Sequence, residues 1–248
     1  MTLRIRIALD HTPPSRRAME WAAQMAMQWQ APLEALFIED SRLFEIAQLP
    51  FIRQIDVSGS GSAFDPDSLS HEIKRQSQSL EKALQELAER RELALEFRTV
   101  RGRVLNEIRR ACEEVGLLII QGRRSVSSLP RETVMAVFDG SEAAAEVLQI
   151  ALRAVPPTSL HLLLQADTPE QAQALRAQVG QMMRDAGIES LPSSYLPQHD
   201  GDHLLHLATL EQPTALFVAS NNTLLEDHVL EALSTRLPCP LAIVGQGM

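Results

Sequence analysis

The chain has 248 residues, 45% of them hydrophobic and 22% charged, with a formal net charge of -9. This composition excludes intrinsic disorder, a collagen-like repeat and a coiled-coil rod, and the length admits one large or two small domains. No apolar run approaches the ~20 residues of a membrane-spanning helix, no secretory signal is evident, and Cys112 and Cys239 form no Cys-x-x-Cys pair, so we expect a soluble, cytoplasmic protein.

Strand patterns alternate with amphipathic helix patterns along the first half of the chain. Strands are predicted at Arg4 to Asp10, Leu33 to Ile38, Leu95 to Val100 and Leu117 to Gln121, and helices after Pro14, at Ser68 to Arg90 and at Val104 to Val115. Between the second strand and the long helix lies a stretch ending in Ser-Gly-Ser-Gly-Ser, which predicts a long loop or lid.

The same order starts again after a short polar linker. Strands are predicted at Thr133 to Asp139, Ser159 to Leu164, Ser193 to Leu196, Ala215 to Ala219 and Leu241 to Val244. Helices are predicted after Ser141, between Thr168 and Gly187, at Asp202 to Leu210, and before Pro238 with Thr223 and Glu226 as a capping box.

Alternating strands and helices predict an α/β fold with parallel sheets and crossover helices. The two halves look like one unit used twice, since IRIALD aligns with VMAVFD and GLLIIQG with TALFVAS. We therefore expect a first repeat at residues 1–130 and a second at 131–248. The first repeat is truncated, because it stops after its fourth strand and lacks the last helix and strand.

These residues resemble the universal stress protein family in its tandem form. The resemblance rests on Asp10 and Asp139 at the ends of first strands, Val100-Arg-Gly-Arg103 before a helix, the apolar strand running into Gly122, and the Leu237-Pro-Cys-Pro segment before the last strand. It implies two Rossmann-like, doubly wound repeats, similar to the adenine nucleotide alpha hydrolases, paired about a pseudo-two-fold axis. Some family members bind an adenine nucleotide at the carboxyl edge of the strands.

Family members that bind ATP have a Gly-x2-Gly-x9-Gly-Ser/Thr run after the fourth strand, where glycines let the backbone approach phosphate. The second repeat has Ser220, Thr223, Leu233 and Ser234 at these places. The first repeat keeps Gly122 but has neither the following glycines nor the helix. We expect that neither repeat binds ATP in the family manner, and we predict no cofactor.

Four arginines of the first repeat follow strands that end at the same edge of its sheet. Arg101 and Arg103 follow the third strand, and Arg123 and Arg124 follow the fourth. With Asp10 and Gly122 they could bind a small anion or a nucleotide phosphate. The favoured alternative is that they solvate the surface or pair with acidic residues. Asp10 and Asp139 could each contact a ribose or an ion, but the favoured reading is that each caps the turn that follows it.

No residues assemble a catalytic triad. Ser141 follows Asp-Gly rather than standing in a nucleophile elbow. His199, His203 and His206 lie near two aspartates but in a turn and a helix start without fixed geometry, so a solvated loop is favoured over a metal site and we predict no metal. Metal-dependent catalysis there is the third and weakest hypothesis.

Contacts with a protein partner or a second copy are expected. The apolar residues between Leu43 and Ile55 are either tucked over the sheet edge, which is favoured, or offered to another chain. Leu241 to Val244 is a candidate edge strand for a homodimer. Residues 1–130 carry 18 basic and 18 acidic side chains, against 5 and 14 in residues 131–248, so nucleic acid is not an expected partner.

The leading hypothesis is a non-enzymatic cytoplasmic stress-response protein that regulates or interacts through contacts and has lost family-type ATP binding. The alternative is a nucleotide or small-anion sensor, or a slow ATPase, that binds at the carboxyl strand edge of the first repeat.

Overall fold

A computed structural model describes residues 4–10, 16–49, 53–55, 61–63, 66–122 and 133–245. The strands are β1 (Ile5–Leu9), β2 (Leu33–Asp40), β3 (Arg53–Ile55), β4 (Gly61–Ala63), β5 (Leu95–Gly102), β6 (Leu117–Ile120), β7 (Val134–Phe138), β8 (Leu160–Ala166), β9 (Ser193–Pro197), β10 (Ala215–Ala219) and β11 (Leu241–Val244). The helices are α1 (Arg16–Trp29), α2 (Ser41–Ala47), α3 (Pro66–Arg91), α4 (Val104–Glu114), α5 (Glu142–Ala154), α6 (Pro169–Asp185), α7 (Gly201–Glu211) and α8 (Asp227–Arg236), with 3-10 turns η1 (Pro157–Ser159) and η2 (Thr223–Leu225).

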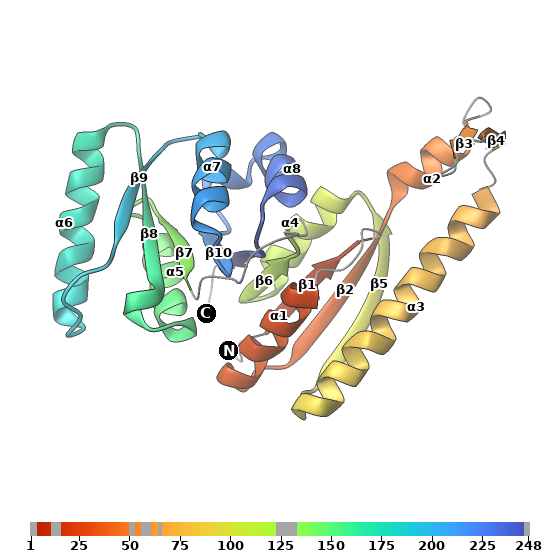
Figure 1. Ribbon diagram of the computed structural model, residues 1–248, viewed down its shortest axis with the longest axis horizontal. Coiled ribbons are helices and arrows are strands. Elements are labelled where there is room, and N and C mark those ends of the chain that lie inside the picture. The colour runs from red at the N-terminus through yellow and green to blue at the C-terminus, as the bar shows by residue number, and fades with distance from the viewer. Residues whose placement is uncertain are drawn as a thin grey trace.

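Nine strands form one continuous sheet in the spatial order β5-β2-β1-β6-β11-β10-β7-β8-β9 (Figure 1). Neighbours are parallel everywhere except at β6 and β11. The α/β fold class is therefore confirmed. The groups β5-β2-β1-β6 and β9-β8-β7-β10 have the same strand order, which agrees with a repeated unit. The duplication itself, with its boundary at residue 130, stays a prediction.

Helices cover both faces of the sheet and bury two apolar layers. Helices α1, α3, α5 and α6 pack on one face, and α4, α7 and α8 on the other. Strand residues alternate between the layers, as Ile7 and Ala8 of β1 show. Every residue of β6, β7, β10 and β11 is buried, which explains their unbroken apolar sequences.

Local capping signals fix some helix ends but not all. Thr168 accepts a hydrogen bond from the backbone N–H of Gln171, and Gly187 closes α6 with a φ of 74°, as predicted. The capping box of Thr223 and Glu226 is wrong. Thr223 begins η2 instead, and Glu226 precedes α8 without a side-chain cap bond.

The stretch after β2 is more ordered than the predicted loop. Asp40 caps α2, which occupies residues Ser41–Ala47, and β3 pairs with β4 in an antiparallel hairpin. With the start of α3 these elements form an arm that projects from the sheet (Figure 1). Leu43 and Phe44 pack partly against the core, whereas Ile46 is 48% exposed. The described part of this apolar segment, up to Leu49, is therefore only partly tucked against the core, and Phe51 and Ile52 lie outside the described residues.

Strand β11 lies in the middle of the sheet, so the prediction that Leu241–Val244 is an edge strand is wrong. It pairs with β10 in parallel and with β6 in antiparallel orientation. Both of its edges are hydrogen-bonded within the chain, which leaves none for a second copy. The fourth strand of the first half thus pairs with the last strand of the second half, and this β6/β11 pair is the joint that holds the two halves in one sheet.

Two glycines permit the close packing of this joint. A Cβ atom on Gly122, after β6, would lie 2.0 Å from the carbonyl oxygen of Cys239, before β11. A Cβ atom on Gly245, after β11, would lie 2.2 Å from the carbonyl oxygen of Val115, before β6. Each strand end therefore abuts the backbone that leads into the other strand, and only glycine fits there.

Candidate functional site

Ligands of doubly wound sheets bind beyond the carboxyl ends of the strands, where the strand order reverses. In the second half this switch point lies between β7 and β10, which are parallel neighbours. Asp139 directly follows β7, and Ser220 to Thr223 follow β10. Gln165 lies at the end of β8, beside β7. The chain thus brings one carboxylate, three amides and two hydroxyls to this edge.

The polar groups at this switch point bond to one another. The amide nitrogen of Asn222 donates to Asp139 Oδ2 at 3.1 Å and to Gln165 Oε1 at 2.7 Å. Gln165 donates in turn to the hydroxyl of Thr223 at 3.2 Å. Gln165 is 3% exposed and Asn222 is 6% exposed. Buried amides need hydrogen-bond partners, and here the side chains supply them to one another. We call the bonded set of Asp139, Gln165, Asn222 and Thr223 the switch-point network.

Asp139 also acts as a cap. Its Oδ1 accepts a hydrogen bond from the backbone N–H of Ser141 at 2.9 Å, and Ser141 Oγ caps α5 by accepting one from Ala144. The favoured reading of Asp139 as a turn cap is therefore correct. The role of Asn222 was missed, although an Asn-Asn pair after a buried strand was a visible signal.

The four positions aligned with the family's phosphate run do not share one loop. Ser220 and Thr223 lie in the turn after β10. Leu233 and Ser234 lie inside α8, where Leu233 is fully buried in the core and Ser234 donates to the Glu231 carbonyl. Both residues therefore lie inside the helix predicted before Pro238, since α8 starts at Asp227, well before them.

At the start of α8 the charges are negative. Glu226 is the residue before the helix, and Asp227 is in its first turn. Carboxylates are stabilised at a helix N-terminus, but they occupy the position at which a phosphate would otherwise be attracted. Asp227 is paired with Arg109 of α4 at 2.7 Å, so this cation is already neutralised.

In the first half, Asp10 and Gly122 lie at the corresponding edge. Gln121 donates from Nε2 to Asp10 Oδ1 at 3.0 Å across the β1/β6 pair. Gly122 is packed against the backbone before β11. This contact explains why residue 122 is a glycine without any role in phosphate binding. Whether Asp10 caps the following turn stays a prediction, because residues 11–15 lie outside the described part.

Of the four arginines expected to bind one anion together, the structure describes two. Arg101 is paired with Glu39 at 2.8 Å, and its guanidinium lies 4.1 Å from the centroid of the Phe44 ring. Arg103 is exposed at the start of α4. Arg123 and Arg124 lie outside the described residues. Since β5 and β6 are three strand spacings apart, about 14 Å, the two strand ends do not converge. A joint anion site stays a prediction, and Arg101 already has its acidic partner.

The histidine cluster shows the structure of a capped turn. Asp200 caps α7 by accepting a hydrogen bond from the His203 N–H at 2.8 Å. Asp202 is paired with Arg236. Nowhere in the described part of the chain do three metal-ligating side chains gather.

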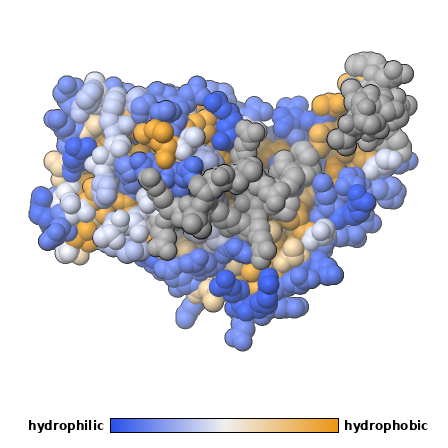
Figure 2. All heavy atoms as spheres, viewed as in Figure 1, coloured by the Kyte–Doolittle hydropathy of each residue, from blue (hydrophilic) through white to orange (hydrophobic). Residues whose placement is uncertain are grey.

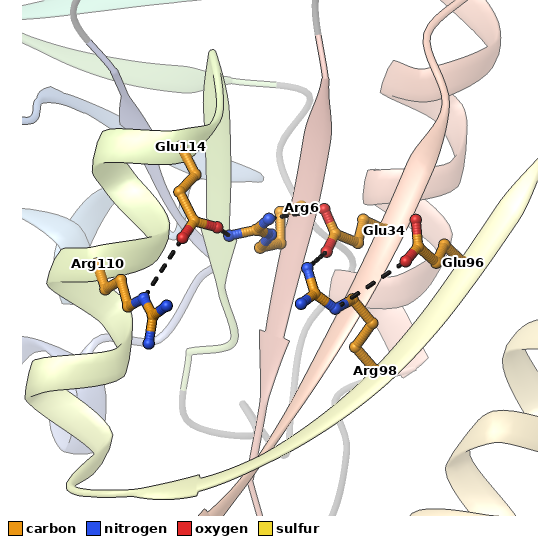
Figure 3. Close-up of polar contacts among 6 residues, drawn as sticks. All are labelled: Arg6, Glu34, Glu96, Arg98, Arg110 and Glu114. Carbon is orange, nitrogen blue, oxygen red and sulfur yellow. Dashed lines mark hydrogen bonds and ion pairs between the residues drawn. The ribbon is translucent and has the colours of Figure 1, made fainter.

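A chain of charges crosses the N-terminal half of the sheet (Figure 3). The buried Arg6 of β1 contacts Glu34 of β2 and Glu114 of α4, each at 2.8 Å. Arg98 of β5 approaches Glu34 from the other side at 3.3 Å. The Arg6 hydrogen bond lowers the pKa of Glu114. The sequence pattern places Arg6 and Glu34 in strands without predicting this contact, although a charge within each apolar run was a signal.

A cavity of about 640 Å³ lies between the two halves, and sequence reasoning missed it. Its walls are α4, the Ser220–Thr223 turn, the start of α8 and the end of β11. Cys112 lines it, but burial, and then Glu113, raise the pKa of this thiol to about 12, so it is not a nucleophile at neutral pH.

No protein-family model matches the chain, and no curated protein matches it. A solved universal stress protein from Archaeoglobus fulgidus is similar, with 16% identity and a TM-score of 0.58, over 98% of this chain and 96% of that one. A functionally unknown Pseudomonas aeruginosa protein has 10% identity over 97% and 92%, with a TM-score of 0.49. A universal stress protein family member from Burkholderia pseudomallei has 16% identity over 46% and 96%, with a TM-score of 0.34. The first likeness shows a shared fold.

None of the described helices combines the length and apolar character that crossing a membrane requires.

Proposed function

We propose that the chain is a non-enzymatic, cytoplasmic regulatory protein of the universal stress protein type that works through contacts and not by binding ATP in the family manner. The shared fold supports the type. The observation that carries the proposal is the switch-point network, in which Asn222 links Asp139 and Gln165. Side chains of the protein itself satisfy the groups that would otherwise face a nucleotide.

Physical reasons oppose a triphosphate at this edge. A phosphate loop needs backbone N–H groups that the chain can bring close to the ligand, and glycines make that approach possible. After β10 the chain instead forms η2, whose Leu224 N–H is taken by Asn222 Oδ1 at 2.9 Å. Glu226 and Asp227 follow. Arg109 offsets the charge of Asp227, and the charge of Glu226 remains to repel phosphate.

The contact role has a surface that supports it. The arm formed by α2, β3, β4 and the start of α3 projects from the sheet, and hydrophobic side chains of α2 reach the surface there (Figure 2). Ile46 is 48% exposed, and Leu49, just beyond α2, is 42% exposed. In this proposal the partner is another protein or a second copy of the chain.

Calorimetric titration with Mg-ATP and with AMP tests the proposal. We expect no saturable heat at micromolar protein, and no nucleotide released when the purified protein is denatured. The matched variant is Asn222→Gly with Glu226→Gly, which opens the network and removes one acid. Micromolar ATP binding by the unaltered protein would overturn the non-nucleotide function.

A further inference from the structure

We propose that the cavity between α4 and α8 binds a small organic cation with an apolar stem, in the class of alkyl- and arylamines. Its volume, about 640 Å³, lies within the range of roughly 300 to 1,000 Å³ that small-molecule sites occupy. This binding site goes beyond the proposed function, because the proposed ligand is not a nucleotide and the cavity does not include the arm.

The floor of the cavity is apolar and comes from both halves of the chain. Ile108 belongs to α4 of the first half, whereas Leu230 of α8 and Ile243 of β11 belong to the second. Each of the three is about 1% exposed, so the floor is fixed in the packed layer beneath it. Methylene groups or an aromatic ring of a ligand would leave water on entering it.

The rim carries an excess of negative charge. Glu113 on α4 and Glu226 before α8 both line the cavity and are exposed. Within the described residues neither carboxylate has a basic partner within ion-pair distance. Arg109 is the one described cation in the lining, and Asp227 pairs with it at 2.7 Å. Two carboxylates therefore remain to meet a positively charged group, and an anionic ligand would be repelled.

Hydrogen-bond acceptors stand beside these carboxylates. Ser220 and Asn221 line the cavity from the turn after β10, and their side chains make no hydrogen bond with another described residue. An ammonium group has only donors, so hydroxyl, amide and carboxylate oxygens are suitable partners. Asn222 separates the cavity from the switch point and is held by Asp139 and Gln165. A ligand here would not require that network to open.

The test compares three probes with the same stem: n-hexylamine, n-hexanol and hexanoate. Calorimetry or ligand-observed NMR on the full chain should rank their affinities amine, alcohol, carboxylate. In Glu113→Gln with Glu226→Gln, the preference for amine over alcohol should fall about tenfold, the combined effect of two partly exposed ion pairs. The affinity for hexanol should change less than about twofold, because the apolar floor is untouched.

Two further variants keep the result interpretable. Glu170→Gln removes an exposed carboxylate on α6, away from the lining, and should leave all three affinities unchanged. Cys112→Leu adds side-chain volume inside the cavity and should weaken every probe. The proposal is overturned if hexanoate binds as well as hexylamine, if no probe binds, if the double variant keeps the amine preference, or if Cys112→Leu changes nothing. Each of these results is independent of ATP binding.

Discussion

Gly122→Ala is expected to destabilise the protein by more than about 4 kcal/mol, or to prevent it from accumulating in soluble form. The new Cβ atom would lie 2.0 Å from the Cys239 carbonyl oxygen and 2.5 Å from its carbonyl carbon. Both atoms are backbone, and they lead directly into β11, so neither can move without disturbing the β6/β11 pair. Urea unfolding followed by circular dichroism measures the loss of unfolding free energy.

Two glycines serve as comparisons. Gly245→Ala should be comparably severe, since its Cβ atom would lie 2.2 Å from the Val115 carbonyl oxygen. Gly180→Ala should instead stabilise by roughly 0.5 to 1 kcal/mol, because Gly180 lies inside α6 and the nearest atom is a flexible arginine end at 3.6 Å. If the unfolding free energy of Gly122→Ala lies within about 1 kcal/mol of that of the unaltered protein, the close packing of the β6/β11 joint is wrong.

Arg6→Met should cost about 3 to 5 kcal/mol of unfolding free energy. The substitution keeps the apolar stem but leaves Glu34, which is 7% exposed, with only the more distant Arg98. Burying a carboxylate without a close partner is expensive, and this cost dominates. The double variant Arg6→Met with Glu34→Leu should recover to within about 1 kcal/mol of the unaltered protein, because it removes both buried charges.

The pH dependence of stability tests the contact between Arg6 and Glu114 in a second way. The Arg6 hydrogen bond lowers the pKa of Glu114 below the ordinary glutamate value of 4.5. A depressed pKa stabilises the fold above the unfolded value, and that contribution disappears as the pH falls through the folded value. The difference in unfolding free energy between Arg6→Met and the unaltered protein should therefore become smaller below about pH 4.5. Arg75→Met, which removes an exposed pair with Glu72, should change stability by less than about 0.5 kcal/mol and show no narrowing.

The sequence predicted most elements because their signals are local. Unbroken apolar runs marked β6 and β10, and the stripe of Ile73, Leu80 and Leu84 marked α3, since burial on one face sets a helical period. The capping of α6 by Thr168 follows the same logic. These features depend on neighbours a few residues away along the chain.

Features that depend on distant residues could not be predicted. The residues Leu241–Val244 do not by themselves indicate that β11 pairs with β6 as well as with β10. An edge strand and a central strand can share the same apolar pattern. The switch-point network joins Asp139, Gln165 and Asn222 across three elements, and each looks like an ordinary turn or strand-end residue alone. The cavity likewise needs α4 and α8 from different halves.

Observing the switch-point amides in the presence of nucleotide shows whether this edge of the sheet is closed to ATP. In a ¹⁵N-resolved NMR spectrum, the side-chain NH₂ group of Asn222, assigned with Asn222→Ser, reports on its bonds to Asp139 and Gln165. We predict slow solvent exchange relative to the exposed Asn221 and no change in chemical shift with millimolar Mg-ATP. A saturable shift of the Asn222 signal, with loss of its protection from solvent exchange, would mean that nucleotide opens the switch-point network.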